Sequence, residues 1–104
     1  MAAELVARLE ATLSAGLDAR AARGVLRSLE DKALVQSGLY LDGGLRDAGD
    51  PPGGRRIAGF VTRADGRDLT ERERTRVEAW LASIPQIIAF SVGPLQPADA
   101  AEDR

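Results

Sequence analysis

The sequence predicts a small α+β domain, in which helices cover one face of a three-stranded sheet. The expected order is αββαβ, preceded by an additional N-terminal helix. A length of 104 residues with 44% hydrophobic residues fits one globular domain. Apolar segments of strand length alternate with charged segments whose apolar positions recur at helical spacing. We place a single domain at residues 1–93 and a flexible C-terminal tail at 94–104, because that tail is polar and contains proline.

Two helices are expected at the N-terminal end. Residues 3–15 form the first, because Leu5, Val6, Leu9 and Leu13 lie at helical spacing, and Gly16 ends it. Asp18 is the expected N-cap of the second helix, "ARAARGVLRSLEDKA". The apolar stripe of this second helix comprises Ala22, Val25, Leu26 and Leu29. One bent helix in place of the two is the alternative.

Three segments are predicted as strands, at residues 34–41, 56–63 and 86–92. The fifteen residues after Leu41, "DGGLRDAGDPPGGRR", contain five glycines, two prolines and three aspartates, which predicts a long hairpin loop. The first two strands therefore form an antiparallel hairpin. The connection from the second to the third strand is long enough for a parallel pair joined by a right-handed crossover.

The junction between the second strand and the last helix is expected to connect these elements rather than to bind an anion. Asp65-Gly66 supplies a turn, and Thr70 with Glu73 forms a capping box at the start of a helix over 70–83. The two capping side chains occupy the amides that an anion needs, and acidic residues in the first turn repel phosphate. The buried stripe of this helix is predicted as Val77, Trp80, Leu81 and Ile84.

The composition excludes several kinds of chemistry. Cysteine and histidine are absent, which removes disulfides, thiolate zinc sites, cysteine nucleophiles and the usual general base. Asp42, Asp47 and Asp50 do not have the spacing of a calcium loop, and the glycines of "GDPPGGRR" lead into a strand rather than a helix. We therefore predict no catalytic residue, no cofactor and no metal site.

Charge and hydropathy limit the partners. The net charge of −2 and the alternating signs predict no binding to nucleic acid. No segment approaches the ~20 apolar residues of a membrane span, so no membrane contact is expected. Glu4 and Arg8 interrupt the apolar run that a signal peptide needs, so we expect a cytoplasmic protein.

The segments "VLRSLEDKALVQSGLYL", "GGRRIAGFVTRADGRDLTERE" and "WLASIPQ" together resemble the C-terminal subdomain of adenylate-forming (AMP-binding) ligases. The resemblance runs from about residue 22 to 97 and implies helix–strand–strand–helix–strand. That family carries its catalytic lysine in a Gly-Lys pair near the end, and the tail after Pro97 has no lysine. The resemblance therefore implies a chain that does not adenylate a substrate alone.

Residues 56–95 also look similar to a BON domain, a small non-enzymatic module. The shared features are the strand "IAGFV", a charged helix and the return strand "IPQIIAFSV". This second resemblance implies the same order of elements.

The functional prediction is a small non-catalytic protein-interaction domain, either an adaptor or an accessory domain. The alternative is a stand-alone accessory or remnant piece of an adenylate-forming acyl or aryl ligase that lacks the catalytic lysine. Because a small sheet with apolar residues on both faces needs a second cover, we favour a homodimer over a lid formed by residues 3–15. The expected interface residues are Ile88, Phe90 and Val92 on the third strand, and Leu5, Leu9 and Leu13 on the first helix.

Overall fold

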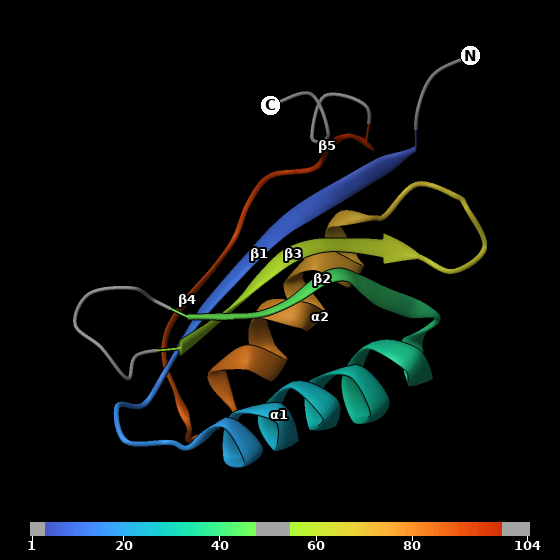
Figure 1. The fold of residues 1–104 in the computed structure, drawn as a ribbon. Coiled ribbons are helices and arrows are strands. Elements are labelled where there is room, and N and C mark those ends of the chain that lie inside the picture. Colours follow the sequence, from blue (N-terminus) through green and yellow to red (C-terminus); the bar gives the residue numbers. More distant parts are fainter. Residues whose placement is uncertain (1–3, 48–54, 99–104) are drawn as a thin grey trace.

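A computed structural model describes residues 4–47 and 55–98 of the chain as a two-layer α+β domain (Figure 1). Within these residues the strands are β1 (Leu5–Leu13), β2 (Leu39–Asp47), β3 (Arg55–Arg63), β4 (Ile87–Val92) and β5 (Gln96–Pro97). The helices are α1 (Ala19–Ser28) and α2 (Glu71–Ala82). A π-helical turn (Leu29–Leu34) and a 3-10 turn (Val35–Ser37) continue α1 towards β2.

The described strands form one antiparallel sheet in the order β2-β3-β1-β4, and the short β5 also pairs with β1. With the helices included, the chain runs β1-α1-β2-β3-α2-β4. This succession in one antiparallel sheet is the split βαβ arrangement of ferredoxin-like folds. Both helices lie against the same face of the sheet, as Figure 1 shows, and neither α1 nor α2 covers the opposite face.

The predicted N-terminal helix over residues 3–15 is wrong, because Leu5–Leu13 is a strand at the centre of the sheet. Leu5, Leu9 and Leu13 are spaced four residues apart, and this spacing places side chains on one side of a helix and also on one side of a strand. Ala7 and Ala11, both almost fully buried, complete the alternation of a strand. Burial between β3 and β4 therefore decides the structure of a segment rich in helix-forming residues.

The predicted parallel pairing of the second and third strands is also wrong. β1 lies between β3 and β4 and pairs antiparallel with each of them. β3 and β4 therefore run in the same direction without touching as neighbours. Because residues 3–15 were expected to be helical, the prediction contained no strand that could lie between the second and third predicted strands.

The first predicted strand is shifted towards the C-terminus. Residues 34–37 belong to the helical turns, and Gly38, at φ 75°, ends them in the left-handed conformation that favours glycine. β2 then continues to Asp47, so residues 42–47 of the predicted loop are part of a strand instead. Residues 48–54 of that predicted loop lie outside the described residues, and its last two residues, Arg55 and Arg56, begin β3.

Other predicted elements are confirmed. Asp18 caps α1 by accepting a hydrogen bond from the Ala21 backbone N–H at 2.7 Å. The predicted strand 56–63 corresponds to β3 and the predicted strand 86–92 to β4. α2 begins at the predicted capping box, with Thr70 and Glu73 exchanging hydrogen bonds. The fold is therefore α+β as expected, with more strands than the sequence predicted.

The core lies between the sheet and the two helices. The inward-facing residues of β1 meet the apolar stripes of α1 and α2, and Trp80 and Ile84 pack at its margin. The largest side chains that are almost completely buried are Leu9, Leu13, Leu29, Leu34, Leu39, Ile57, Leu69, Leu81, Val6, Val61 and Val77. Burying each of these apolar side chains contributes roughly 1.5–3 kcal/mol.

β2 and β3 approach each other closely at a pair of facing glycines, Gly43 and Gly59. A Cβ atom added to Gly59 would lie 2.5 Å from the backbone oxygen of Asp42 and 2.8 Å from the Cα atom of Gly43. The two backbones therefore leave no room for a methyl group on this side of the sheet. Gly44, the next residue along β2, has nothing within 4 Å of its added Cβ.

The β4 edge of the sheet is interrupted in two places. The pairing register with β1 shifts between Thr12 and Leu13, which leaves Ile88 as an extra residue in β4. After Val92 the strand stops, and the chain pairs with β1 again only at Gln96–Pro97. The first part of the predicted tail is thus held against β1, and residues 99–104 lie outside the described residues.

Arg74 of α2 ties the helix to the point where β4 stops. Its guanidinium donates hydrogen bonds to the backbone oxygens of Val92 and Gly93, both at 2.6 Å. These oxygens lie where the strand pairing ends, so the arginine supplies hydrogen bonds at a break in the ladder. The same guanidinium lies 3.6 Å from carboxylate oxygens of Glu71 and Glu78.

We expect Gly59→Ala to lower the free energy of unfolding by about 1–3 kcal/mol, because the new methyl group forces β2 and β3 apart. Gly44→Ala is the matched control on β2 and should change this free energy by no more than about 0.5 kcal/mol. Urea unfolding followed by circular dichroism measures both. Equal stability of the two variants would contradict the close approach at Gly59.

Arg74→Met should lower the free energy of unfolding by about 1.5–3 kcal/mol, because the carbonyl groups of Val92 and Gly93 lose a charged donor. Arg72→Met removes the same charge from an exposed position of α2 and is expected to have an effect within about 0.5 kcal/mol. Hydrogen exchange adds a local measurement: in Arg74→Met the amide of Gly93, which donates to the Arg8 oxygen at 2.8 Å, should exchange faster. Unchanged exchange at Gly93 would show that the Arg74 side chain does not stabilise the backbone at the end of β4.

Candidate functional site

The candidate site lies on the face of the sheet opposite α1 and α2, which we call the helix-free face. The pairing register places its residues in rows across the strands: Asp42, Phe60 and Arg8 form one row, and Gly44, Ala58 and Glu10 form the next. The other side chains on this face include Tyr40, Thr62, Arg46, Arg56 and Thr12. Polar and aromatic side chains alternate with small ones, which distinguishes this face from the apolar face beneath the helices.

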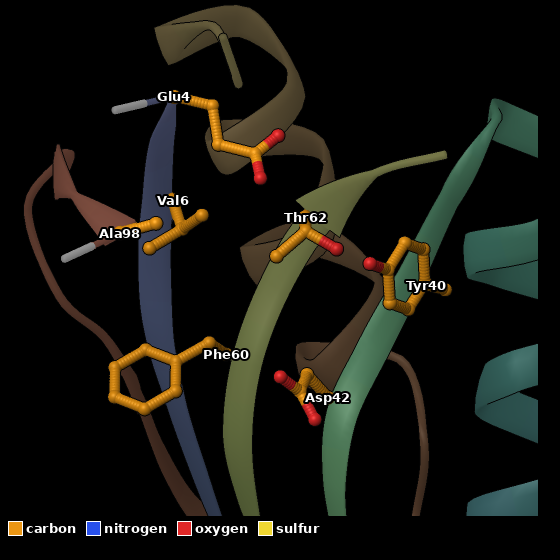
Figure 2. A pocket seen from close by; sticks show the side chains of 7 residues that line it. All are labelled: Glu4, Val6, Tyr40, Asp42, Phe60, Thr62 and Ala98. Carbon is orange, nitrogen blue, oxygen red and sulfur yellow. The ribbon is translucent and has the colours of Figure 1, made fainter. Parts of the chain in front are cut away.

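A hollow of about 120 Å³ lies at one end of this face (Figure 2). The residues that line it come from β1, β2 and β3, from the residue before β1 and from the residue after β5: Glu4, Val6, Tyr40, Asp42, Phe60, Thr62 and Ala98. Figure 2 shows the carboxylates of Glu4 and Asp42 on opposite sides of the hollow, with the Thr62 side chain between them.

Strand pairing fixes the positions of these side chains. Tyr40 lies opposite Thr62, and Asp42 lies opposite Phe60, between β2 and β3. The Ala98 backbone N–H donates to the Glu4 backbone oxygen at 2.8 Å, so these two residues lie side by side at the rim of the hollow. The hollow is therefore built mostly on the rigid part of the sheet rather than on loops.

Thr62 is the polar side chain whose burial stands out. It is only 7% exposed, and within residues 4–47 and 55–98 its hydroxyl oxygen has no hydrogen-bond partner. Figure 2 shows this hydroxyl on the side of the hollow where the Tyr40 hydroxyl points towards it. A buried hydroxyl without a partner costs free energy, roughly 1–3 kcal/mol, so Thr62 offers an unsatisfied hydrogen-bonding group.

The two ends of the helix-free face differ in charge. Glu4 and Asp42 lie at the hollow, and within residues 4–47 and 55–98 no ion pair involves either of them. At the other end Arg46 and Arg56 face each other across β2 and β3, and both are exposed. Because like charges placed opposite each other on a sheet repel, Arg46 and Arg56 disfavour each other at this end.

The residues predicted as an interface do not share one surface. Leu9, Leu13 and Val92 are buried beneath the helices, and Leu5 is half-buried. Ile88 is 64% exposed and Phe90 37% exposed, so these two of the predicted set lie on the surface, along the β4 edge.

The loop acids do not come together as a metal site. Asp42 points to the hollow, whereas Asp47 ends β2 and Asp50 lies outside the described residues. Among the residues that the structure describes, no cluster of three or more acidic, cysteine or histidine side chains could hold a metal ion.

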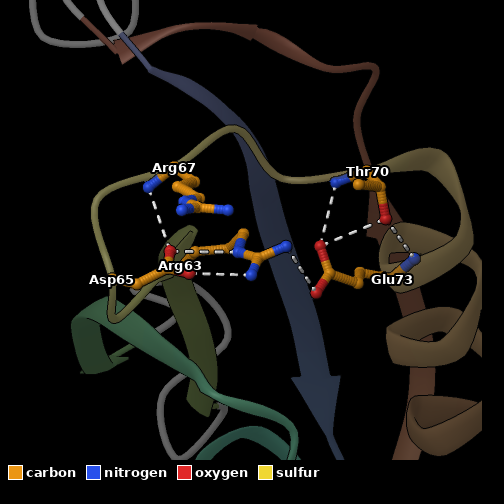
Figure 3. Close-up of polar contacts among 5 residues, drawn as sticks. All are labelled: Arg63, Asp65, Arg67, Thr70 and Glu73. Carbon is orange, nitrogen blue, oxygen red and sulfur yellow. Dashed lines mark hydrogen bonds and ion pairs between the residues drawn. The ribbon is translucent and has the colours of Figure 1, made fainter.

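The junction before α2 is closed by its own side chains (Figure 3). The Thr70 hydroxyl accepts a hydrogen bond from the Glu73 backbone N–H at 3.2 Å. The Glu73 carboxylate accepts one from the Thr70 backbone N–H at 3.0 Å, as the capping box predicts. Arg63, at the end of β3, lies between the two acids of the junction, 2.8 Å from Asp65 and 3.4 Å from Glu73. These contacts connect β3 to α2. The backbone N–H groups of Thr70 and Glu73 already donate to the capping side chains.

Asp65 and Asp68, which flank Arg67 in the sequence, have separate partners. Asp65 accepts from the Arg63 side chain and, at 3.0 Å, from the Arg67 backbone N–H. Asp68 accepts from the Leu5 backbone N–H at 2.9 Å and so fixes the start of β1. The hydrogen bond with Asp65 raises the pKa of Arg63, and the hydrogen bonds from Arg63 and then Arg67 lower the pKa of Asp65 below its usual value of 3.8.

Comparison with known proteins adds no relative: no family model, no curated protein and no solved structure matches the chain. The resemblances to adenylate-forming ligases and to BON domains therefore stay predictions. In the part of the chain that the structure describes, neither helix has the length and apolar character to span a membrane.

Sequence reasoning considered Asp42 only as an acid of a calcium loop and rejected it, and it did not connect Asp42 with Glu4, Tyr40 and Thr62. The signal lies in the strand period, because Tyr40 and Asp42 alternate with the buried Leu39 and Leu41. Finding the site would also have required the register between β2 and β3, which pattern alone does not set.

The lowered pKa of Asp65 predicts how its ion pair responds to acid. A carboxyl group whose pKa falls on folding stabilises the folded state above its unfolded pKa, and this contribution disappears as the pH falls through the folded value. NMR titration of the Asp65 carboxyl carbon should give a midpoint below 3.8 in the folded chain. Arg63→Gln should move that midpoint up towards the ordinary value, and Arg72→Gln should leave it unchanged.

Proposed function

We propose that this chain is a small non-catalytic protein-interaction domain and that the helix-free face of its sheet is the binding surface. The observation that carries the proposal is a sheet face that neither α1 nor α2 covers, on which Phe60 is flanked by Asp42 and Arg8. An aromatic side chain surrounded by polar residues is the usual composition of a protein-binding patch. The absence of cysteine and histidine from the sequence supports a role without nucleophilic or imidazole chemistry.

The layer arrangement supports the choice of face. A sheet usually buries at least one face against helices, and α1 and α2 fill this role on the inner face. The outer face is left with half-buried Phe60 and with Tyr40, which is 47% exposed. A partner that covers these two rings removes their remaining apolar surface from water, which favours association.

A homodimer through this face is one form of the proposal. A two-fold axis that lies between two facing sheets, across the strands, turns the acidic end of one copy towards the basic end of the other. Asp42 and Arg46 are both on β2, on either side of Gly44, so an axis near Gly44 brings opposite charges together. This arrangement replaces the earlier interface prediction, in which Leu9, Leu13 and Val92, three of the six residues, are buried beneath the helices.

A photo-crosslinking amino acid tests the surface directly. Placed at position 58, in the middle of the helix-free face, it should give discrete crosslinked species in the source cell. Placed at position 31, an exposed position on the helical side, it should give none. A crosslinked species with the mass of two chains would identify the homodimer, and another mass would identify a different protein partner.

Phe60→Lys provides the matching variant. It removes the aromatic ring from the face, and crosslinking from position 58 should fall at least several-fold, while the circular dichroism spectrum stays that of the parent chain. Equal crosslinking from positions 58 and 31, or crosslinking that survives Phe60→Lys, would argue against this surface.

A further inference from the structure

We propose that the hollow between Glu4, Tyr40, Asp42 and Thr62 binds a cationic side chain, the ammonium of a lysine or the guanidinium of an arginine, presented by a protein partner. This inference rests on the proposed function, because it names the chemistry by which the helix-free face recognises its partner. Three features of the hollow carry it: the kind of polar atoms, a Thr62 hydroxyl without a partner among the described residues, and two carboxylates that take part in no ion pair of those residues.

The polar side-chain atoms that line the hollow are all oxygens. Glu4 and Asp42 contribute carboxylates, and Tyr40 and Thr62 contribute hydroxyls. Ionised carboxylates only accept hydrogen bonds, and hydroxyls have lone pairs to offer. An ammonium group brings three donors and a guanidinium five, and neither brings an acceptor. The hollow therefore complements a cation that donates several hydrogen bonds.

Thr62 supplies an observation independent of the two acids. Its hydroxyl oxygen is buried and has no hydrogen-bond partner among the described residues, and it lies where the pairing with Tyr40 brings two hydroxyls to the same side of the hollow. A buried polar group without a partner is expected to have a role in binding or strain. A donor that enters beside Tyr40, with a small rotation of that exposed ring, satisfies the oxygen.

The negative charge of the hollow is not neutralised by the cations nearby on the sheet. Arg8, in the same row as Asp42, is turned to Glu10, with 2.8 Å between its guanidinium nitrogen and the carboxylate oxygen. Arg63, next to Thr62 in β3, is held by Asp65 and Glu73 at the junction. Both arginines thus have partners elsewhere, and the field at the hollow favours an incoming cation.

The size and the walls fit a side chain better than a larger ligand. A volume of about 120 Å³ holds roughly four water molecules at ~30 Å³ each, whereas cofactor sites usually measure roughly 300–1,000 Å³. Val6, Phe60 and Ala98 give an apolar wall for the methylene stem of the side chain. The aromatic rings of Tyr40 and Phe60 add faces on which a cation can rest.

Small probes test the chemistry on the intact chain. n-Butylammonium and n-butylguanidinium are titrated at constant ionic strength, and amide shifts are followed by NMR. Both should give saturable shifts at Tyr40, Asp42, Phe60 and Thr62, whereas neutral n-butanol should give none. A blocked peptide, acetyl-Val-Lys-Val-amide, should bind at the same amides at least as tightly as butylammonium, and its norleucine analogue should not.

The variants test whether binding depends on the carboxylate at the hollow or only on the net charge of the chain. Asp42→Asn should weaken butylammonium binding at least five-fold, and Asp31→Asn, which makes the same change on the helical side, should leave it unchanged. Thr62→Val should weaken binding several-fold and at the same time raise the urea midpoint of the free chain, because it removes an unpaired buried hydroxyl. A Thr62→Val variant with a lower urea midpoint would show that the hydroxyl is satisfied in the free protein and would overturn its role as an acceptor for the ligand.

The remaining outcomes are decisive as well. Equal binding of n-butanol, or binding that survives Asp42→Asn, would overturn the cation site. Saturation by Ca²⁺ at lower concentrations than by butylammonium would overturn it in favour of a metal site. Binding of butylammonium without binding of the lysine peptide would remove the protein side chain as the source of the cation. If crosslinking from position 58 succeeds while every probe fails, the proposed function stands and this inference alone falls.

Discussion

The pairing of β1 with both β3 and β4 is the constraint on which the rest of the domain depends. Leu9 and Ala11 of β1 are buried between the two neighbouring strands and the helices, and the registers on both sides pass through these same residues. Because β1 occupies the centre, α1 and α2 both cross back over one face, and the other face stays free. Asp68 and Leu69 anchor the first residue of β1 from the junction before α2, which couples this strand to the helix layer.

How much of this architecture the sequence predicts depends on how local each signal is. The capping box at Thr70 and the N-cap at Asp18 were predictable, because a cap requires a few residue types at fixed short distances. The centre of the sheet was not, because leucines four residues apart satisfy the helical and the strand period alike. Gly43 was assigned to a loop by composition, although in β2 it faces Gly59 and allows the two backbones to meet.

The candidate site shows the same division between local and distant information. Asp42 attracts attention in the sequence as one acid of a loop, yet it lines the same hollow as Thr62 of β3 and Glu4, the residue before β1. Only the register between β2 and β3 brings Tyr40 opposite Thr62, and this register follows from burying Leu41 against Val61 on the inner face. The composition of the outer face is therefore a consequence of packing on the inner face.

The interruptions of the β4 edge also determine whether this edge can accept a further strand. An uninterrupted edge strand presents a row of free N–H and C=O groups that another strand can extend, which leads to aggregation. Here the extra residue Ile88 shifts the ladder, and Pro94 lacks an N–H just beyond the end of β4, where Arg74 already engages the last carbonyl groups. The exposed backbone of β4 is thus a poor template for a further strand.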